Sequence, residues 1–356
     1  MIILGLDVGG ANTKAALVNF KNSEIIDTIS YLEYFPFWEK TLDDILGMFE
    51  RILKRFSKEK TITSKDITYI SITITAELSD AFQTKREGIS TILSALEQIF
   101  EKDKMFFINN ECKFLNFYQV KTNQLSIAAA NWVSTALFLG NFLPECILID
   151  GGSTTIDVIP ILNSIPVTKG KDDLTRIINH ELIYTGGLRA TIPSITHFVP
   201  YKEKLVRISF ERFALISDIH RILNNITEKE YINDTADNRS KSLNDCYARL
   251  SRIICMDIET ISKEDLDIIA KYIYEKQIHI ISYEIKEFIK ELIHRFPQFL
   301  NNPKFVITGL SADFLIRKAL EGLGYTNISS FREITQIPDN TSSSAFAVAG
   351  ALNLQL

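Results

Sequence analysis

Two short segments combine an aspartate, a glycine pair and small polar side chains, residue types that suit binding of phosphate groups and Mg²⁺. The segments are ILGLDVGGANTKAALV, from Ile3 to Val18, and CILIDGGSTTIDVIPI, from Cys146 to Ile161. Each runs from an apolar stretch through the aspartate and Gly-Gly into a second apolar stretch. Glycine has no Cβ, so such a turn brings backbone N–H groups close to phosphate oxygens. The aspartates, Asp7 and Asp150, are placed to hold Mg²⁺ directly or through water.

A single Asp-Gly-Gly turn is more often an ordinary tight hairpin. The repetition favours phosphate binding, because two turns facing each other across a cleft could clamp one phosphate chain and direct both aspartates at one metal. A simple turn also does not need the donors that follow each glycine pair. The residues expected to bind phosphate are Gly9, Gly10, Asn12, Thr13, Lys14, Gly151, Gly152, Ser153, Thr154 and Thr155.

The pattern around the first turn predicts mixed α/β layers. Three β-rich runs lie between Ile2 and Tyr34, with turns at Gly9-Gly10 and Lys21-Asn22. The apolar spacing and β-branched density then predict alternating helices and strands, giving the order βββαβαβ. The predicted ranges are a helix at 41–56, a strand at 67–75, a helix at 86–100 and a strand at 104–110.

The same order begins again at Cys146, with strands ending at Asp150 and running from Thr154 to Ile161. A long amphipathic helix is predicted from Lys263 to Arg295, with an apolar stripe facing one side. The stripe consists of Leu266, Ile269, Ile273, Ile281, Ile285, Phe288 and Leu292. KFVITGL at 304–310 is predicted to be a strand ending in a glycine turn, and SSAFAVAGALNL a tightly packed C-terminal helix.

The segment from about 164 to 262 fits no repeat of the first half and is predicted to be an insertion. HELIYTGGLRATIP reads as a hairpin with a glycine-rich turn, and YINDTADNRSKSLND has the composition of an exposed loop. Asp234, Asp237 and Arg239 in that loop could order over substrate or remain solvated. Such insertions often carry substrate specificity on a repeated scaffold.

Composition limits the function classes. The 356 residues are enough for two domains, and the 46% hydrophobic and 23% charged residues are ordinary globular values. A net charge of -5 argues against a broad basic face for nucleic acid or anionic lipid. No apolar stretch approaches the roughly 20 residues that span a bilayer.

The N-terminal apolar run is interrupted too early for a secretory signal, so no targeting segment is expected. The four cysteines show no close-paired metal spacing and no density typical of small secreted domains. A cytoplasmic protein is therefore expected. The five histidines are scattered, and His180 and His220 are predicted to be structural.

Five segments in chain order resemble motifs of the actin, sugar-kinase and Hsp70 superfamily. They are DVGGANTK, TAELSD, DGGSTTIDVIPI, TGLSADFL and SSAFAVAGAL, similar to the two phosphate motifs, the connecting elements and the nucleoside motif of that superfamily. The resemblance implies two RNase-H-like α/β domains around a central cleft. The expected domains are 1–140 plus 341–356, and 145–340 carrying the insertion.

A narrower resemblance rests on GLDVGGANTKAA, TITAELSDAFQTKREGI, AAANWVSTALFLG, LIYTGGLRATIP and ARLSRIICMD. These look like an archaeal group of the hydantoinase and oxoprolinase type, which includes the condensing enzyme of methanofuran biosynthesis. The resemblance implies a transferase that joins (5-(aminomethyl)furan-3-yl)methyl diphosphate to the phenol oxygen of γ-glutamyltyramine and releases diphosphate. The implied partners are therefore a small-molecule diphosphate and a phenolic amine, with Mg²⁺ as cofactor and neither nucleic acid nor membrane.

The resemblance also assigns roles by position. Asp7 and Asp150 become the Mg²⁺ anchors and Lys14 neutralises a phosphate. Gly309, in the segment that resembles the nucleoside motif, is a further phosphate-binding residue. Glu77 lies where related enzymes place a group that activates the attacking hydroxyl or water. Alternatively, Glu77 or Asp80 caps the following helix, and Asp80 is the other candidate for the base.

The segment IYTGGLRATIP offers Gly186, Gly187 and Arg189 as a substrate site, since a guanidinium can hold phosphate or carboxylate bidentately. An ordinary hairpin with an exposed arginine is the alternative. Two other functions stay open: an ATP-dependent small-molecule kinase or hydantoinase-like hydrolase, and a nucleotide-binding regulator without chemistry. Leu310 and Ser311 replace the richer glycine turn common in kinases, which argues against tight ATP binding.

Overall fold

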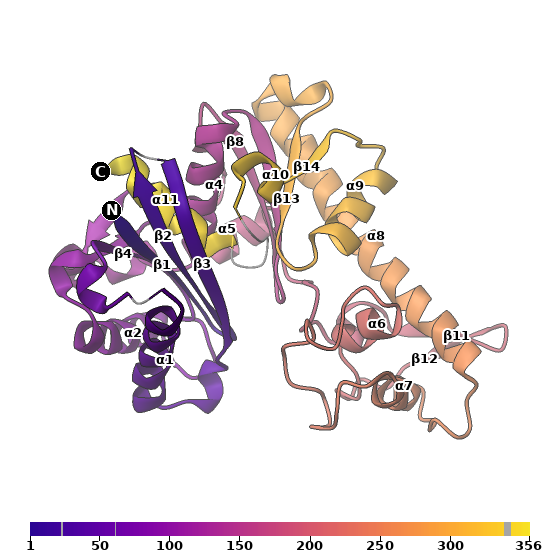
Figure 1. Ribbon diagram of the computed structural model, residues 1–356. Coiled ribbons are helices and arrows are strands. Elements are labelled where there is room, and N and C mark those ends of the chain that lie inside the picture. The colour runs from indigo at the N-terminus through magenta and orange to yellow at the C-terminus, as the bar shows by residue number, and fades with distance from the viewer. Residues whose placement is uncertain (23, 61, 338–342) are drawn as a thin grey trace. The chain divides into compact units, whose positions relative to one another are not determined.

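The computed structural model of the chain describes residues 1–22, 24–60, 62–337 and 343–356. They form two compact units, each described here by itself (Figure 1). Unit 1 comprises Met1–Leu148, Ile159–Ile178 and Ser329–Leu356, and unit 2 comprises Ile149–Val158 and Asn179–Ile328. The units are groups of contacting residues, whereas the predicted domains rest on a repeated topology, so the predicted boundaries stay a prediction. Positions 341–342 of the first predicted domain and 338–340 of the second lie outside the described residues.

The first sheet has six strands in the order β3-β2-β1-β4-β5-β6. β1 is antiparallel to β2 and parallel to β4, and Asp7 lies in register between Lys14 on β2 and Thr73 on β4. The predicted βββαβαβ order is confirmed. The strands are β1 Ile2–Gly9, β2 Asn12–Lys21, β3 Glu24–Tyr34, β4 Tyr69–Thr75, β5 Met105–Ile108 and β6 Phe114–Asn116.

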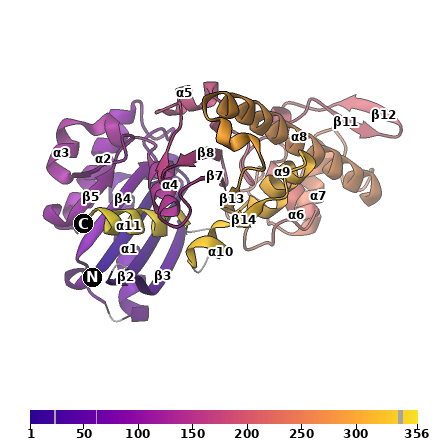
Figure 2. The same cartoon turned by 90° about the horizontal axis from the view of Figure 1, so that it is seen from above.

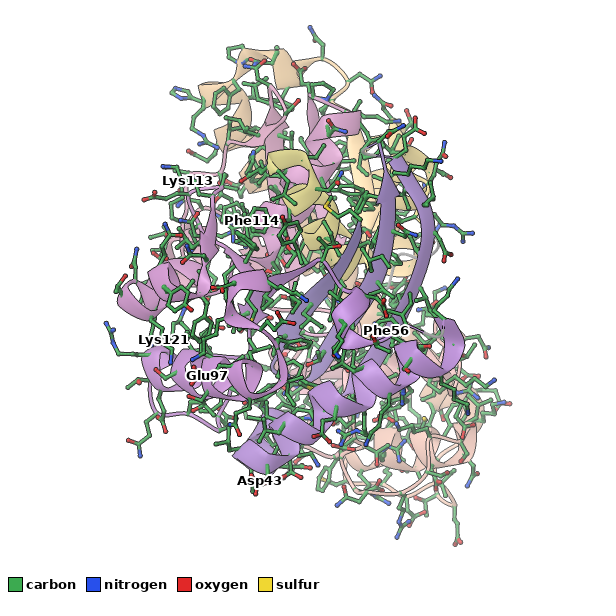
Figure 3. The ribbon with its side chains drawn as sticks, turned by 60° about the vertical axis from the view of Figure 1, so that its left-hand side comes forward. Asp43, Phe56, Glu97, Lys113, Phe114 and Lys121 are labelled. Carbon is green, nitrogen blue, oxygen red and sulfur yellow. The ribbon has the colours of Figure 1, made fainter. Side chains whose placement is uncertain are left out.

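The two faces of the first sheet differ because side chains alternate along each strand. Leu4, Leu6 and Val8 of β1 join the apolar core formed with α1 (Leu42–Lys60) and α2 (Lys85–Ile99). Figure 3 marks Asp43 in the first turn of α1 and Phe56 toward its other end, where Phe56 is buried with its ring centroid 4.9 Å from that of Tyr31.

The other face of β1 carries Gly5 and Asp7 and packs against α11 (Ser343–Gln355), drawn in yellow in Figures 1 and 2. A Cβ at Gly5 would lie 2.0 Å from the carbonyl oxygen of Ala345, so only glycine allows this approach. The prediction of a tightly packed C-terminal helix on the N-terminal half is confirmed. The remaining helices of unit 1 are α3 Phe117–Thr122, α4 Asn131–Phe142, α5 Asp173–Ile178 and α10 Phe331–Thr335.

The second six-stranded sheet has the order β10-β8-β7-β13-β14, with β9 paired to β8. When β9 and the separate β11-β12 pair are left out of the count, the strands from β7 onward repeat the third-second-first-fourth-fifth order of the first sheet. The similar sequences of the two glycine turns predict this repeat. The predicted α/β class is confirmed. The strands are β7 Cys146–Gly151, β8 Ile156–Leu162, β9 Ile165–Pro166, β10 Leu182–Ile183, β13 Phe305–Thr308 and β14 Ile328–Ser330.

The predicted long helix is confirmed as α8, Lys263–Arg295, and every residue of its predicted apolar stripe is buried. Its first half forms a core with the insertion. A single π-helical turn, Ala312–Arg317, follows β13 and continues into α9, Lys318–Gly322. The insertion contains β11 Phe198–Tyr201, β12 Lys204–Arg207, α6 Ile216–Ile222 and α7 Leu243–Arg252. No helix among the described residues is long and apolar enough to span a membrane.

Two predictions for the insertion are wrong. The segment HELIYTGGLRATIP forms no hairpin of its own: its strand β10 pairs with β8, through Leu182 opposite Asp157 and Ile183 opposite Ile156. Pairing with β8 replaces the predicted local hairpin because β8 offers an edge to which β10 can hydrogen-bond.

The stretch YINDTADNRSKSLND is also not simply an exposed loop. Tyr231, Asn233 and Thr235 are buried. The loop wraps Arg249, which lies 2.8 Å from Asp218 in a fully buried ion pair and 3.1 Å from Asp237. Asp237 is therefore a structural partner of arginine, because a buried guanidinium needs its donors satisfied.

Candidate active site

Asp7 is a buried carboxylate close to the end of β1, with only one of its two oxygens engaged. Oδ2 accepts a hydrogen bond from Ser344 Oγ at 2.5 Å and lies 3.5 Å from Lys14 Nζ. Lys14 Nζ also donates to Ser344 Oγ at 3.2 Å. Oδ1 is buried and has no hydrogen-bond partner within the described chain. A desolvated carboxylate oxygen left in this state is suited to a cation or a ligand donor.

The surroundings of Asp7 fit a hard cation. Asn12 Oδ1 and Thr73 Oγ1 are further buried oxygens that lack partners among the described residues, and both residues lie on the sheet face that carries Asp7. Thr13 pairs with Val8 and lies on the opposite face. Mg²⁺ prefers oxygen ligands and commonly keeps several waters or substrate oxygens. The described residues contain no group of three or more His, Cys, Asp or Glu side chains that could hold a metal alone, so substrate oxygens would have to complete such a site.

Glu77 is a second buried carboxylate, two residues beyond the end of β4. It is 1% exposed, and its Oε2 has no hydrogen-bond partner in the described part of the chain. Burial raises the pKa of Glu77 to about 7, with nearby Lys85 lowering it and Asp173 raising it. Lys85 and Asp173 form an ion pair of 2.9 Å. A carboxyl group with this pKa can take up a proton near neutral pH.

The packing that buries Glu77 comes from α2. A Cβ at Gly88 would lie 2.7 Å from the Cα of Glu77, so glycine lets the helix approach the loop. The side chain of Thr84 caps α2 by accepting from the N–H of Glu87 at 3.1 Å. The alternative that Glu77 or Asp80 caps this helix is therefore wrong.

The second glycine turn is held mainly by backbone contacts. Gly152 N–H donates to the carbonyl of Thr155 at 2.9 Å, and Ser311 N–H donates to the carbonyl of Gly151 at 2.9 Å. Gly309 has φ +89°, and a Cβ there would lie 2.4 Å from Asp150 Oδ1. Only glycine combines that backbone conformation with such an approach.

The segment after β10 is hydrogen-bonded along the outside of this turn. N–H groups of Gly186 and Gly187 donate to the carbonyls of Thr154 and Gly152 at 2.9 and 3.0 Å. Those of Leu188 and Arg189 both donate to the carbonyl of Ser153, at 3.0 and 3.1 Å. The Gly186–Arg189 segment is thus fixed to the turn by four backbone hydrogen bonds, two of which use the N–H groups of its glycines.

A profile of the hydantoinase/oxoprolinase family matches residues 68–352. The chain is also 34% identical over 357 residues to a protein of Methanocaldococcus jannaschii, covering 100% of this chain and 99% of that protein. The chain belongs to the hydantoinase/oxoprolinase family. The predicted membership is confirmed.

The relative from M. jannaschii is named (4-{4-[2-(gamma-L-glutamylamino)ethyl]phenoxymethyl}furan-2-yl)methanamine synthase. A Methanococcus vannielii protein of the same name is 34% identical over 187 residues, covering 52% of this chain and 80% of that protein. A nucleotide-free acetone carboxylase has TM-score 0.53 at 12% identity, covering 98% of this chain and 70% of that one. At that identity the likeness concerns the fold alone.

In this family member the predicted site residues fall into two sets. Unit 1 brings Asp7 and Lys14 together and places Glu77 on the neighbouring strand end, while unit 2 brings Asp150 to Gly309. The shared Mg²⁺ site of Asp7 and Asp150 stays a prediction, as does substrate contact by Gly186, Gly187 and Arg189. Arg189 Nη1 lies 3.5 Å from Thr154 Oγ1, at the limit of a hydrogen bond.

Sequence reasoning missed Ser344 and Lys85. Ser344 lies in the quoted segment SSAFAVAGAL, where two serines open an otherwise apolar small-residue helix. Lys85 opens α2 and reaches Asp173 across 88 positions of sequence, so local spacing gives no sign of the pair.

Proposed function

We propose that the chain is a transferase of methanofuran biosynthesis that condenses (5-(aminomethyl)furan-3-yl)methyl diphosphate with γ-glutamyltyramine. The name of the full-length relative supports the acceptor and the ether product. The observation that carries the proposal is the pair of buried carboxylates, Asp7 and Glu77, each with one oxygen lacking a partner among the described residues. One carboxylate suits the departing anion through a cation, and the other suits the incoming phenol.

The reaction breaks the bond between the furan methylene carbon and the diphosphate oxygen, and diphosphate leaves with the electron pair. The phenol oxygen forms a new ether bond to the same carbon, and the phenol proton passes to a base. Furan stabilises positive charge on the methylene carbon, so bond breaking can run ahead of bond formation. The residues must therefore stabilise the leaving group and remove one proton.

Lys14 places a compact positive charge beside Asp7 for the departing diphosphate. The glycine turn after β1 allows phosphate oxygens to approach the backbone. Asp7 would hold Mg²⁺, which when bound supplies further positive charge for the diphosphate. Ser344 fixes the orientation of the Asp7 carboxylate by donating to Oδ2.

Glu77 is the base in this proposal. A phenol has a pKa near 10, so at neutral pH it attacks weakly unless its proton is removed as the bond forms. Burial brings the pKa of Glu77 to about 7, much closer to that of the phenol than an exposed glutamate would be. Asp80 is exposed and therefore less suited to this role.

The test is to incubate the purified protein and Mg²⁺ with the furan diphosphate and γ-glutamyltyramine, and to measure ether product and released diphosphate together. Equal amounts of both are expected. Diphosphate without ether would indicate a hydrolase. Phosphate transfer from ATP to a metabolite panel would establish a kinase, and ATP binding without turnover would favour a regulator.

A further inference from the structure

Gln277 interrupts the apolar stripe of α8. Positions 273, 277, 281 and 285 lie four residues apart along this stripe. Three of them are fully buried isoleucines, and the fourth is Gln277, with 0% exposure. A buried amide costs free energy unless its donors and acceptor are all engaged. An apolar side chain at this position would pack as well against the core, so the reason for a glutamine must lie in its hydrogen bonds.

The hydrogen bonds of Gln277 fix which end of its amide group donates and which accepts. Nε2 donates to the carbonyl of Gly186 and to Thr185 Oγ1, both at 3.1 Å. A carbonyl only accepts, so the amide nitrogen must face Gly186, and Oε1 must accept from His220 Nε2 at 3.0 Å. His220 Nδ1 then lacks a proton and accepts from Asn225 Nδ2 at 3.1 Å.

His220 belongs to α6 of the insertion and is completely buried, which lowers its pKa to about 3 and keeps the ring neutral. Its ring also packs against Phe314 in the π-helical turn, with centroids 4.6 Å apart. Phe314 in turn lies beside Gly187, where an added Cβ would be 3.3 Å from its ring. Helix α6 is thus linked to the Gly186–Arg189 segment both through Gln277 and through Phe314.

We infer that Gln277 is a positioning residue: with His220, it sets the Gly186–Arg189 segment against the turn at Gly152–Thr154 and so shapes that turn for diphosphate. This inference rests on the proposed function. Gln277 acts only through the segment, because its amide bonds to Gly186 and that segment makes four backbone hydrogen bonds to the turn. Helices α6 and α8 thereby adjust the phosphate turn without contributing a ligand to it.

Gln277→Met tests the inference, since it keeps the length of the side chain and removes both donors. Ile281→Val, one helical turn along the same stripe, is the matched control for a buried change without hydrogen bonds. Binding of inorganic diphosphate with Mg²⁺ is measured by calorimetry, and KM is measured separately for the two substrates. We expect diphosphate affinity and the KM of the furan diphosphate to worsen on the order of tenfold in Gln277→Met, with the KM of γ-glutamyltyramine unchanged. Ile281→Val should change neither.

Unchanged diphosphate binding in a folded Gln277→Met protein would overturn the inference while leaving the proposed function intact. Failure of the wild-type protein to bind diphosphate would remove the proposed function, and this role with it. A second measurement needs no variant: nitrogen NMR of histidine-labelled wild-type protein, which has five histidines, should show His220 neutral with its proton on Nε2. A proton on Nδ1 would reverse the hydrogen bonds and contradict the inference.

Discussion

The two glycine turns have similar sequences but are held in different ways. At the first turn, backbone hydrogen bonds to the carbonyls of Gly10 and Ala11 are joined by a cluster of charged and polar side chains. In this cluster Asp7 contacts Ser344 and Lys14, and one of its oxygens has no partner in the described chain. At the second turn, backbone hydrogen bonds link Gly151 to Ser311 and link Gly152–Thr154 to the Gly186–Arg189 segment. The first turn thus has a cluster of charged side chains beside it, whereas the second is hydrogen-bonded to two neighbouring backbone segments.

The difference shows that two copies of one motif can contribute differently to ligand binding. A charged side chain in a buried setting has strong electrostatic effects, because the local dielectric constant is low. A turn fixed by neighbouring backbone presents its own N–H groups with little reorganisation when a ligand binds. We therefore expect changes near the first turn to affect catalytic rate most, and changes near the second to affect stability and binding.

The largest effect is expected for Glu77→Gln, which removes the base beside the first turn. General-base assistance is typically worth about 10²- to 10⁴-fold, so kcat should fall by that factor. Because the pKa of Glu77 is raised to about 7, the carboxyl is protonated below that pH and wild-type kcat/KM should fall as pH drops through 7. The acidic limb should disappear in Glu77→Gln.

The stability of the same two proteins provides a control. The pKa of Glu77 is higher in the folded than in the unfolded chain, so this group lowers stability as pH rises from about 4.5 to about 7. Glu77→Gln should therefore gain stability relative to wild type at pH 8 compared with pH 4, measured as Tm at both values. A persistent acidic limb with a barely changed rate would instead make Asp80 the next candidate.

Asp7→Asn should lower kcat by roughly 10²- to 10³-fold, because it removes the negative charge that organises Lys14 and a bound cation. The fold should persist, since an amide fits the same space. Asp27→Asn is the control: Asp27 lies on β3 of the same sheet and forms an exposed ion pair of 2.7 Å with Lys60 of α1. Near wild-type turnover in Asp7→Asn would exclude Asp7 from the site.

Gly309→Ala tests the shape of the second turn against a matched control. Gly309 and Gly324 have φ +89° and +87°, but a Cβ at Gly324 meets nothing within 4 Å. Gly324→Ala should cost about 1 kcal/mol from backbone strain alone. Gly309→Ala should cost several kcal/mol, since the new methyl group would collide with Asp150 and Gly151. Equal Tm losses in the two variants would contradict the described packing of this turn.

The smallest effect is expected for Ser344→Ala, which removes one hydrogen bond to Asp7. A reduction of kcat of about tenfold or less is expected. Ser71→Ala is the comparison, because Ser71 Oγ donates to the carbonyl of Val348 at 2.6 Å and ties the same helix to the sheet away from Asp7. Equal kcat values for these two variants would show that Ser344 matters only for packing.

The sequence predicts the regular elements well because their patterns are local. The apolar stripe of α8 and the β-rich run at the start of the chain give elements whose existence is confirmed, and α8 agrees at both ends. The gap in that stripe at Gln277 was visible as a missing apolar position, but its partners Gly186 and His220 lie 91 and 57 positions away in sequence. Which distant groups satisfy a buried polar residue does not follow from spacing.

The candidate site shows the same limit. The motif aspartates, Lys14 and Glu77 could be proposed from residue type and resemblance, and burial then explains the raised pKa of Glu77. The loop around Arg249 was predicted to be exposed because its composition is polar. It is partly buried because the buried guanidinium of Arg249 needs polar partners, among them Asp237 of this loop. Composition describes what a segment prefers in isolation, and one buried charge can override it.

The central claim is that the phenol oxygen attacks carbon and not phosphorus. The most direct measurement uses γ-glutamyltyramine labelled with ¹⁸O in its phenol group, together with the unlabelled furan diphosphate, followed by mass spectrometry of both products. The account predicts that all of the label appears in the ether and none in the released diphosphate. Label in an aryl phosphate ester, with no labelled ether formed, would show phosphoryl transfer and contradict the account.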